Sequence, residues 1–409
     1  LVAAPTVIFE VGVVETRALS GIGLYQPGYV EGRDAGTVQF AAPGLVVNGE
    51  LLGNVRPSVF QRTPETRPLG GRLIVGLQDG SGLDLPDYRA PSINITNDIV
   101  PVTVTPGEPL PDTWLQLELP TRYLTAGGFT RTELYSNGVI SVGADVNLDL
   151  AAGSSLRLQG SVVDVAGDVS AAGGSFAFRS VLVNPAVIAS GTRRPGVFVA
   201  DGVAVDVSGR WVNDLPPLAG DARQDPRFID AGRIDLQVSA LGGELALGND
   251  VRLRADGGAA LGTDGSLTAG RGGAISLQAL GPQAAFATGS GLQLSAFALG
   301  SGGSLTLGAN RLLVAGSGPA FTTAQRADPV AADEPFTVAT GLFQDGGFAS
   351  FRLVASGGRS ADAGSESFEP LSVAAGAVVE PRVSQLSLDR GFRSQPSGDD
   401  RVTAFTEGG

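Results

Sequence analysis

The sequence predicts an all-β chain that folds as a parallel β-helix, a solenoid of short strands with loop insertions. Three observations predict this fold class: short segments of alternating polarity, the absence of a helical period, and a glycine-led signature that recurs along the chain. Gly supplies 60 of the 409 residues, roughly twice its average share. Gly or Pro interrupts nearly every window of 11 residues, so no apolar i, i+3, i+4, i+7 pattern lasts for three helical turns.

Alternation of apolar and polar residues marks the strands. In Asp145–Leu150 the side chains of Val146, Leu148 and Leu150 fall on one face. The same alternation occurs at Ser155–Gln159, Val251–Arg254 and Val102–Thr105. Such a pattern places one face of each strand in a core and the other in water.

A six-residue signature, Gly-Gly-x-apolar-x-apolar, points to stacked coils. It occurs at Gly242–Leu247, Gly272–Leu277 and Gly302–Leu307, 30 residues apart each time, with looser copies at Gly173–Phe178 and Ala231–Leu236. If each coil returns one strand spacing higher, Leu245, Ile275 and Leu305 stack as a ladder. The glycines then occupy a corner that needs a positive φ or a close backbone approach.

A longer repeat relates Gly127–Leu134 to Gly346–Leu353, 219 residues later. A strand-like run precedes each copy, at Leu117–Leu119 and Phe336–Val338. An apolar-Ala-Ala-Gly step follows each copy, at Leu150–Gly153 and Val373–Gly376. This repeat indicates that the sequence covers part of a longer array of repeats.

These patterns divide the chain into three segments. Residues 1–112 form an irregular, Pro-rich β segment, either distorted β-helix or a separate β domain, because 13 of the 25 Pro precede residue 121. Strand-like runs persist there at Val7–Val14, Leu73–Leu77 and Ile93–Ile95. Residues 113–335 form a β-helix repeat unit, with loop-rich insertions near 209–230 and 318–335, and residues 336–409 form a second, truncated copy.

The amino-acid composition limits which catalytic and metal-binding chemistries the chain can support. Cys, His and Met are absent, and all 28 basic residues are Arg. Disulfides, thiol nucleophiles, zinc ribbons, Ser–His–Asp triads and Lys-based phosphate loops are therefore excluded. The net charge of −13 argues against nucleic acid as a partner. We expect a chain that is not an enzyme, with no catalytic residue, cofactor or metal assigned.

Apolar residues are never contiguous for 18 positions, and the amino terminus lacks the n-region and h-region of a signal peptide. Since the chain begins with Leu and lacks Met, we expect it to be processed or cut from a longer polypeptide.

Carboxylates are the main remaining candidates for chemistry. Asp145 and Asp149 fall on one predicted strand face, about 13 Å apart. Glycosidase pairs need separations of about 5–5.5 or 6.5–9.5 Å, so a solvated face is the prediction. Stacking of carboxylates on adjacent coils, about 4.8 Å apart, stays open.

Four further motifs are interpreted as ordinary structural features. Asp79–Asp87 offers oxygen ligands as a calcium loop does but lacks the Glu of an EF-hand, so we expect an ordinary turn there and at Gly262–Gly265. Asn94–Thr96 matches a glycosylation sequon on a strand edge, and Gly32–Asp34 is not the usual integrin tripeptide. The aromatic residues considered for a sugar platform are too few and scattered: Tyr123, Tyr135, Trp114 and Trp211. For Trp211 a core or cap role is preferred over an exposed contact.

The Gly-Gly steps resemble those of filamentous haemagglutinin-type large exoproteins. Val205–Leu215 followed by Ala231–Ile234, and the Gly-Gly-Phe step before a strand, resemble the same family over roughly residues 115–409. The resemblance implies a right-handed parallel β-helix, two-partner secretion through an outer-membrane transporter, and a cell-surface location. The Asn-Pro-Asn-Gly secretion motif and a toxin-like carboxyl-terminal domain are not seen, which implies an interior shaft segment.

The function expected is a non-catalytic structural shaft of a secreted filamentous exoprotein, acting in adhesion or extracellular matrix. One alternative is a β-helical polysaccharide-degrading enzyme or a phage-type spike, and another is the stalk of a contact-dependent toxin. A surface glycan or protein, and self-association into filaments, are the expected partners besides the transporter.

Overall fold

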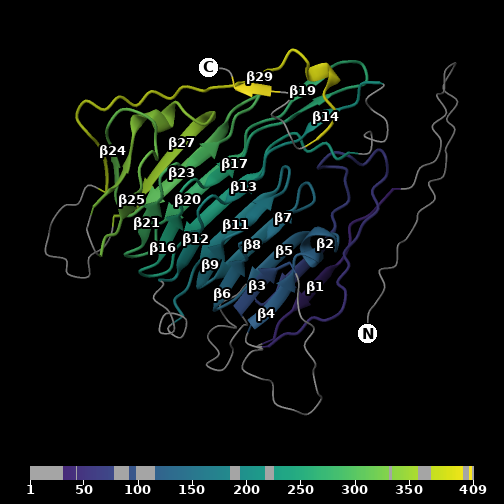
Figure 1. The fold of residues 1–409 in the computed structure, drawn as a ribbon, viewed down its shortest axis with the longest axis horizontal. Helices are drawn as coiled ribbons and strands as arrows, with labels where there is room; N and C mark the ends of the chain where they lie inside the picture. The colour runs from purple at the N-terminus through teal and green to yellow at the C-terminus, as the bar shows by residue number, and fades with distance from the viewer. Residues whose placement is uncertain are drawn as a thin grey trace, which may run out of the picture.

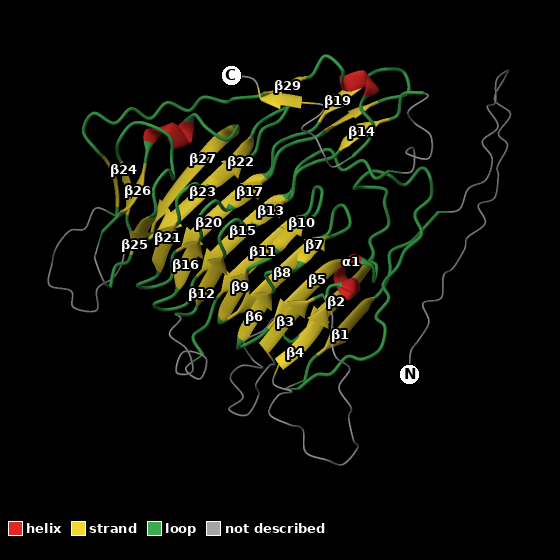
Figure 2. Cartoon of the chain, in the orientation of Figure 1, coloured by secondary structure: helices red, strands yellow, loops and turns green. Residues whose placement is uncertain are grey.

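The computed structural model confirms a parallel β-helix (Figure 1). It describes residues 31–42, 44–77, 92–97, 116–184, 194–216, 225–330, 334–357, 370–398 and 405–407. Three long sheets, named sheets A, B and C, run along the solenoid, and short helices lie at the connections (Figure 2).

One coil shows how the chain winds. It passes from β8 (Ser155–Gly160) in sheet A to β9 (Val162–Val165) in sheet B and β10 (Asp168–Ser170) in sheet C. It then returns to sheet A in β11 (Ser175–Ser180), where Ser175 pairs with Ser155 in parallel register. A complete turn therefore takes 20 residues.

The remaining strands repeat this circuit. Sheet A contains β1 (Thr37–Phe40), β2 (Gly71–Val75), β5 (Phe129–Tyr135), β8, β11, β15 (Arg233–Val238), β20 (Ala274–Ala279), β23 (Gly303–Ala309) and β27 (Phe348–Ala355). Sheet B contains β25 (Gln325–Ala327), β21 (Ala285–Thr288), β16 (Glu244–Leu247), β12 (Gly196–Val199), β9, β6 (Val139–Val142), β3 (Ser92–Thr96) and β4 (Gln116–Pro120). Sheet C contains β22 (Gln293–Ser295), β17 (Arg252–Arg254), β13 (Ala204–Asp206), β10 and β7 (Asn147–Asp149).

Three small sheets and three short helices complete the described structure. The first small sheet contains β14 (Trp211–Asn213), β18 (Ala259–Leu261) and β19 (Leu267–Ala269). The second contains β26 (Phe336–Val338), β24 (Leu312–Val314) and β28 (Leu371–Val373). The third contains β29 (Leu386–Leu388) and β30 (Phe405–Glu407). The helices are α1 (Arg122–Thr125), η4 (Thr340–Phe343) and η5 (Phe392–Ser394).

A single apolar core fills the solenoid, because the inward residues of successive strands stack in rows. In the middle of sheet A one such row is fully buried, at Leu156, Phe176, Ile234, Ile275 and Leu305. The alternation predicted for Val146, Leu148 and Leu150 is confirmed, since all three are buried. Each row removes apolar surface from water along the whole solenoid, which is the main stabilising term.

The predicted 30-residue ladder is only partly correct. Ile275 and Leu305 are paired in sheet A. Leu245 lies in sheet B, where it pairs with Val197 and Phe286. The prediction is wrong for Leu245 because the glycine signature precedes strands of both sheets, and because inserted loops change the length of a coil. Paired residues of successive sheet A strands are 20 residues apart from β8 to β11, 41 from β15 to β20 and 30 from β20 to β23.

The glycine signature has a steric cause. The first glycine of a pair adopts a positive φ at Gly173 and Gly242, 63° and 62°. The second lies against the neighbouring coil, and a Cβ on Gly232 would overlap the carbonyl group of Gly174. A Cβ on Gly273 would overlap the Gly232 carbonyl in the same way. Close backbone approach at this corner therefore requires glycine.

The substitution Gly232→Ala should lower the free energy of unfolding by about 1–3 kcal/mol, because the backbone must shift to admit a methyl group. Chemical denaturation measures the change. The matched control is Gly36→Ala, where no heavy atom lies within 4 Å of the added Cβ. Equal losses in the two variants would contradict the steric account.

The 219-residue repeat has a shared local structure. Phe129 and Phe348 each begin a sheet A strand, and α1 and η4 precede them. A register shift occurs against the preceding strand in both places, between Gly71 and Arg72 and between Gly303 and Ser304. The three-segment division of the chain stays a prediction. Val7–Val14 and Val102–Thr105 lie outside the described residues, whereas β2 and β3 pair with β5 and β6.

The two predicted loop insertions each contain a strand. β25 pairs antiparallel with β21 at the end of sheet B. β14 carries Trp211 into a second small core with Ala259 and Leu261. The segment near the carboxyl end lies across this core, where Trp211 and Gly398 exchange two backbone hydrogen bonds of 3.2 and 3.0 Å.

Candidate functional site

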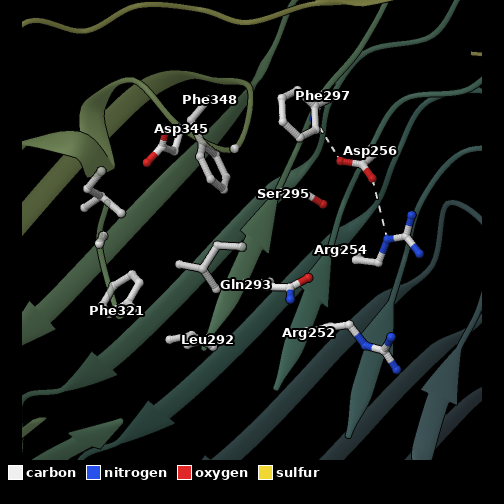
Figure 3. A pocket seen from close by; sticks show the side chains of 14 residues that line it. Arg252, Arg254, Asp256, Leu292, Gln293, Ser295, Phe297, Phe321, Asp345 and Phe348 are labelled. Carbon is white, nitrogen blue, oxygen red and sulfur yellow. Dashed lines mark hydrogen bonds and ion pairs between the residues drawn. The ribbon is translucent and has the colours of Figure 1, made fainter. Parts of the chain in front are cut away.

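A pocket of about 430 Å³ lies at the end of sheet C, beyond β22 (Figure 3). Its polar wall comes from the outward side chains of β17 and β22, and its apolar wall from residues that follow in the chain. Its lining includes Arg252, Arg254, Asp256, Gln293, Ser295, Phe297, Phe321 and Asp345.

The pocket exists because, among the described strands, β22 is the last one of sheet C. The inward row of this sheet is fully buried at Leu148, Val169, Val205 and Leu253. Leu294 continues the row but is only partly buried. Later parts of the chain reach the outer edge of β22 at its ends, where the Gly291 N–H donates to the Phe321 carbonyl (2.9 Å) and the Ala296 N–H to the Gly346 carbonyl (2.7 Å). The pocket lies between these two contacts.

The polar wall is a block of four side chains in register. Arg252 pairs with Gln293, and Arg254 pairs with Ser295 on the neighbouring strand. Arg254 Nε lies 3.8 Å from Asp256 Oδ2, and the Phe297 N–H donates to Asp256 Oδ1 at 2.9 Å (Figure 3). Asp206 Oδ2 lies 3.9 Å from the same Nε. Arg252 is exposed and makes no ion pair with the residues that the structure describes. Asp345 supplies a carboxylate from the segment after η4.

The two carboxylates weighed from the sequence do not form a pair. Asp149 lies on the outward face of β7 and accepts a hydrogen bond from Ser170 Oγ (3.1 Å). Asp145 lies in the turn before β7, where Asn97 Nδ2 donates to its carbonyl oxygen at 2.7 Å. The prediction of one shared strand face is wrong, because the strand starts at Asn147. Both side chains are exposed, as a solvated position predicts.

Paired strand positions do not place two carboxylates side by side within the described part of sheet C. In this sheet Asp149 pairs with Ser170, Asp168 with Asn147, and Asp206 with Ser170 and Arg254. Each carboxylate therefore has a neutral or cationic neighbour at one strand spacing. Outside these paired positions, Asp206 and Asp256 both lie within 4 Å of Arg254 Nε, which places a cation next to both carboxylates.

The other sequence candidates are structural where the structure describes them. Asp264 lies in the hairpin turn between β18 and β19, and its Oδ1 accepts hydrogen bonds from the Ser266 N–H (2.9 Å) and Oγ (2.6 Å). These bonds hold the pKa of Asp264 below its ordinary value. Asp79–Asp87 and Trp114 lie outside the described residues. Within the described part of the chain, no cluster of three acidic or metal-ligating side chains forms.

The sequon and the aromatic candidates also have local partners. Asn94 lies on β3, between β4 and β6, and donates to Glu118 Oε2 at 2.9 Å, so the strand is interior rather than an edge. In Gly32–Asp34, Asp34 Oδ1 accepts a hydrogen bond from the Leu69 N–H. Tyr123, Tyr135 and Trp211 are buried, which confirms the core role of Trp211.

Two buried ionic groups were missed by sequence reasoning. Asp214 accepts two hydrogen bonds from Arg62, both 2.9 Å, and a third from Arg227. Asp328 lies between Arg194 (2.7 Å) and Arg326 (3.1 Å). No sequence signal identifies these groups, because the partners come together only after the coils stack. Both tie loops to the solenoid rather than facing the pocket.

Tyr135 carries the largest pKa shift among the described residues. Burial and a hydrogen bond to Glu133 Oε2 (2.7 Å) raise the pKa of Tyr135 to about 12. Burial alone would raise the pKa of Glu133, but hydrogen bonds from Tyr135 and Arg72 outweigh it and leave that pKa below its ordinary value.

An alkaline titration should therefore show one tyrosine ionising near pH 12 in the folded chain. The absorbance difference between the wild type and Tyr135→Phe isolates it, with circular dichroism confirming the fold at each pH. The neutral phenol is favoured by folding, so its contribution to stability is complete below pH 10 and is lost as the pH rises toward 12. A midpoint near 10 would contradict the buried hydrogen bond.

Fold and pocket together define a parallel β-helix protein with a small polar pocket at the open edge of one sheet. Comparisons with family models, curated proteins and solved structures found no match. Among the described residues, none of the helices is long and apolar enough to span a bilayer.

Proposed function

We propose that this chain is a non-catalytic shaft segment of a secreted, cell-surface filamentous exoprotein that acts in adhesion or extracellular matrix. The observation that carries the proposal is sheet A, nine strands in parallel register over one continuous apolar core. Each coil contacts its neighbours, so the structure extends by adding coils and resists bending as a rod.

The edges of sheet A support a role in assembly. β1 and β27 each pair with one strand among the described residues. Their inward residues are only partly buried: Val38 and Phe40 in β1, and Phe351, Leu353 and Ala355 in β27. A parallel strand placed against either edge would cover these apolar side chains and complete the backbone hydrogen bonds. Pairing between copies is therefore a route to filaments.

The chemistry of the side chains supports a role without catalysis. His, Cys and Lys are absent from the sequence, which removes the commonest bases and nucleophiles. Within the described part of sheet C, the paired strand positions place carboxylates beside Ser, Asn or Arg. Export through an outer-membrane transporter, and binding to a surface glycan or protein, rest on the resemblance of the Gly-Gly steps to exoproteins of the filamentous haemagglutinin type.

The test is to locate and measure the native polypeptide in the cells that make it. Antibody against this chain should label intact cells, brief external proteolysis should remove the label, and electron microscopy of the released protein should show rods. Label that appears only after cell lysis would overturn the proposal. New reducing or unsaturated ends after incubation with acidic glycans would favour the polysaccharide-degrading alternative instead.

A further inference from the structure

We propose that the pocket beyond β22 binds one unit of an acidic saccharide, a uronate-type sugar, with its carboxylate at Arg252 and its hydroxyls toward Asp345. This inference depends on the pocket alone, and it stands or fails independently of the shaft proposal.

The polar wall provides the anion-binding half of the site. Arg252 is exposed on the outward face of β17 and has no ion-pair partner among the described residues. Gln293 lies beside it in register, and Ser295 lies beside Arg254. The Arg252 guanidinium beside an amide, with the Ser295 hydroxyl two residues further along the same strand as that amide, can give a carboxylate several charge-assisted or neutral hydrogen bonds.

Arg254 contributes less to the anion, because two carboxylates already lie near it. Its Nε is 3.8 Å from Asp256 and 3.9 Å from Asp206, and Asp256 also accepts the Phe297 N–H. These contacts hold Arg254 against the sheet and offset its charge. Arg252 therefore provides the uncompensated positive charge of this wall.

The other walls fit the rest of a sugar ring. Asp345 lines the pocket away from the two arginines, and its exposed carboxylate accepts hydrogen bonds, which hydroxyl groups donate (Figure 3). Partly buried Leu294 and Phe297 offer apolar surface for the C–H face of a ring. A neutral sugar would leave Arg252 without an anion.

The scaffold makes this arrangement rigid. The four side chains of the polar wall project from paired strands about 4.8 Å apart, anchored by the core beneath them. Sites built on strands hold their geometry better than sites on loops. A volume of about 430 Å³ is within the range of small-ligand pockets.

The experiment titrates the full chain with digalacturonate and with digalactose, which differ in the carboxylates, and follows binding by NMR. The expected result is binding of digalacturonate at least about tenfold tighter than digalactose, the strength of one charge-assisted hydrogen bond. Arg252→Gln should remove this preference. The matched control, Arg352→Gln, changes an exposed arginine on β27 of sheet A and should leave binding unchanged.

Thermal melts of both variants establish that each is folded, which is expected because both arginines are exposed. Equal affinity for the two sugars, no binding of digalacturonate, or an unchanged preference in Arg252→Gln would each overturn the proposal. A third arm uses a hexapeptide that copies residues 145–150. If this peptide binds when the sugar does not, the pocket is a strand-addition site and the saccharide assignment is wrong.

Discussion

Replacing Phe176 by Ala should lower the free energy of unfolding by about 3–5 kcal/mol, the largest effect expected for a single core residue. Phe176 is fully buried in β11, between Leu156 and Ile234 of the neighbouring coils. Its ring lies nearly parallel to that of Phe178, with centroids 6.3 Å apart. Neighbouring coils fix the backbone around this ring, so the cavity cannot fully collapse.

Urea denaturation followed by circular dichroism measures the loss. The matched control is Gln237→Ala, which shortens an outward side chain on β15 in the same sheet. A change within about 0.5 kcal/mol is expected there. Similar losses in the two variants would mean that the inward row is not the continuous apolar core described above.

Replacing Asp214 by Asn should cost about 3–5 kcal/mol, because it leaves two arginines without their buried counter-charge. Arg62 and Arg227 both bind this carboxylate, and Arg62 also donates to the Asp225 carbonyl at 2.8 Å. The control is Asp230→Asn, which breaks an exposed ion pair with Arg271 (2.7 Å). An exposed pair contributes about 0–1 kcal/mol, so equal losses would contradict the difference in burial.

The Asp214 carboxylate should also make the free energy of unfolding fall at acid pH. Burial alone would raise the pKa of Asp214. The hydrogen bonds and charges of Arg62 and Arg227 lower this pKa by more than burial raises it, so the pKa lies below its ordinary value of 3.8. The stabilisation is therefore complete above about pH 4 and is lost as the pH falls below that value. Unfolding curves of Asp214→Asn should lose this part of the acid dependence, and an unchanged acid dependence would count against it.

Local pattern explains most of what the sequence predicted correctly. Inward positions such as Leu148 and Leu158 follow from alternation alone, because a strand exposes one face to the core whatever its neighbours are. Register is different, because it depends on the length of each coil. Leu245 and Ile275 share a signature but lie in different sheets, and inserted loops of unequal length hide the 20-residue turn.

The pocket could not be predicted for the same reason. Its polar wall joins Arg252 to Gln293, 41 residues apart, and its far wall comes from Phe321 and Asp345. None of these residues is unusual in its own segment. The core role of Trp211, by contrast, was predicted from its size alone. Its hydrogen-bond partner Gln395 lies 184 residues away in the sequence, so this contact could be identified only in the structure.

The most direct test of the account measures whether the coils stack in parallel register, on which both the shaft and the pocket depend. The chain has no native Cys, so Arg157→Cys and Arg352→Cys can carry one spin label each. These outward positions belong to one row of sheet A, in β8 and β27. Five strand spacings separate them, which predicts a narrow distribution near 24 Å, at about 4.8 Å per spacing. A broad distribution, or a mean shorter than about 14 Å, which is three spacings, would contradict the stacked solenoid.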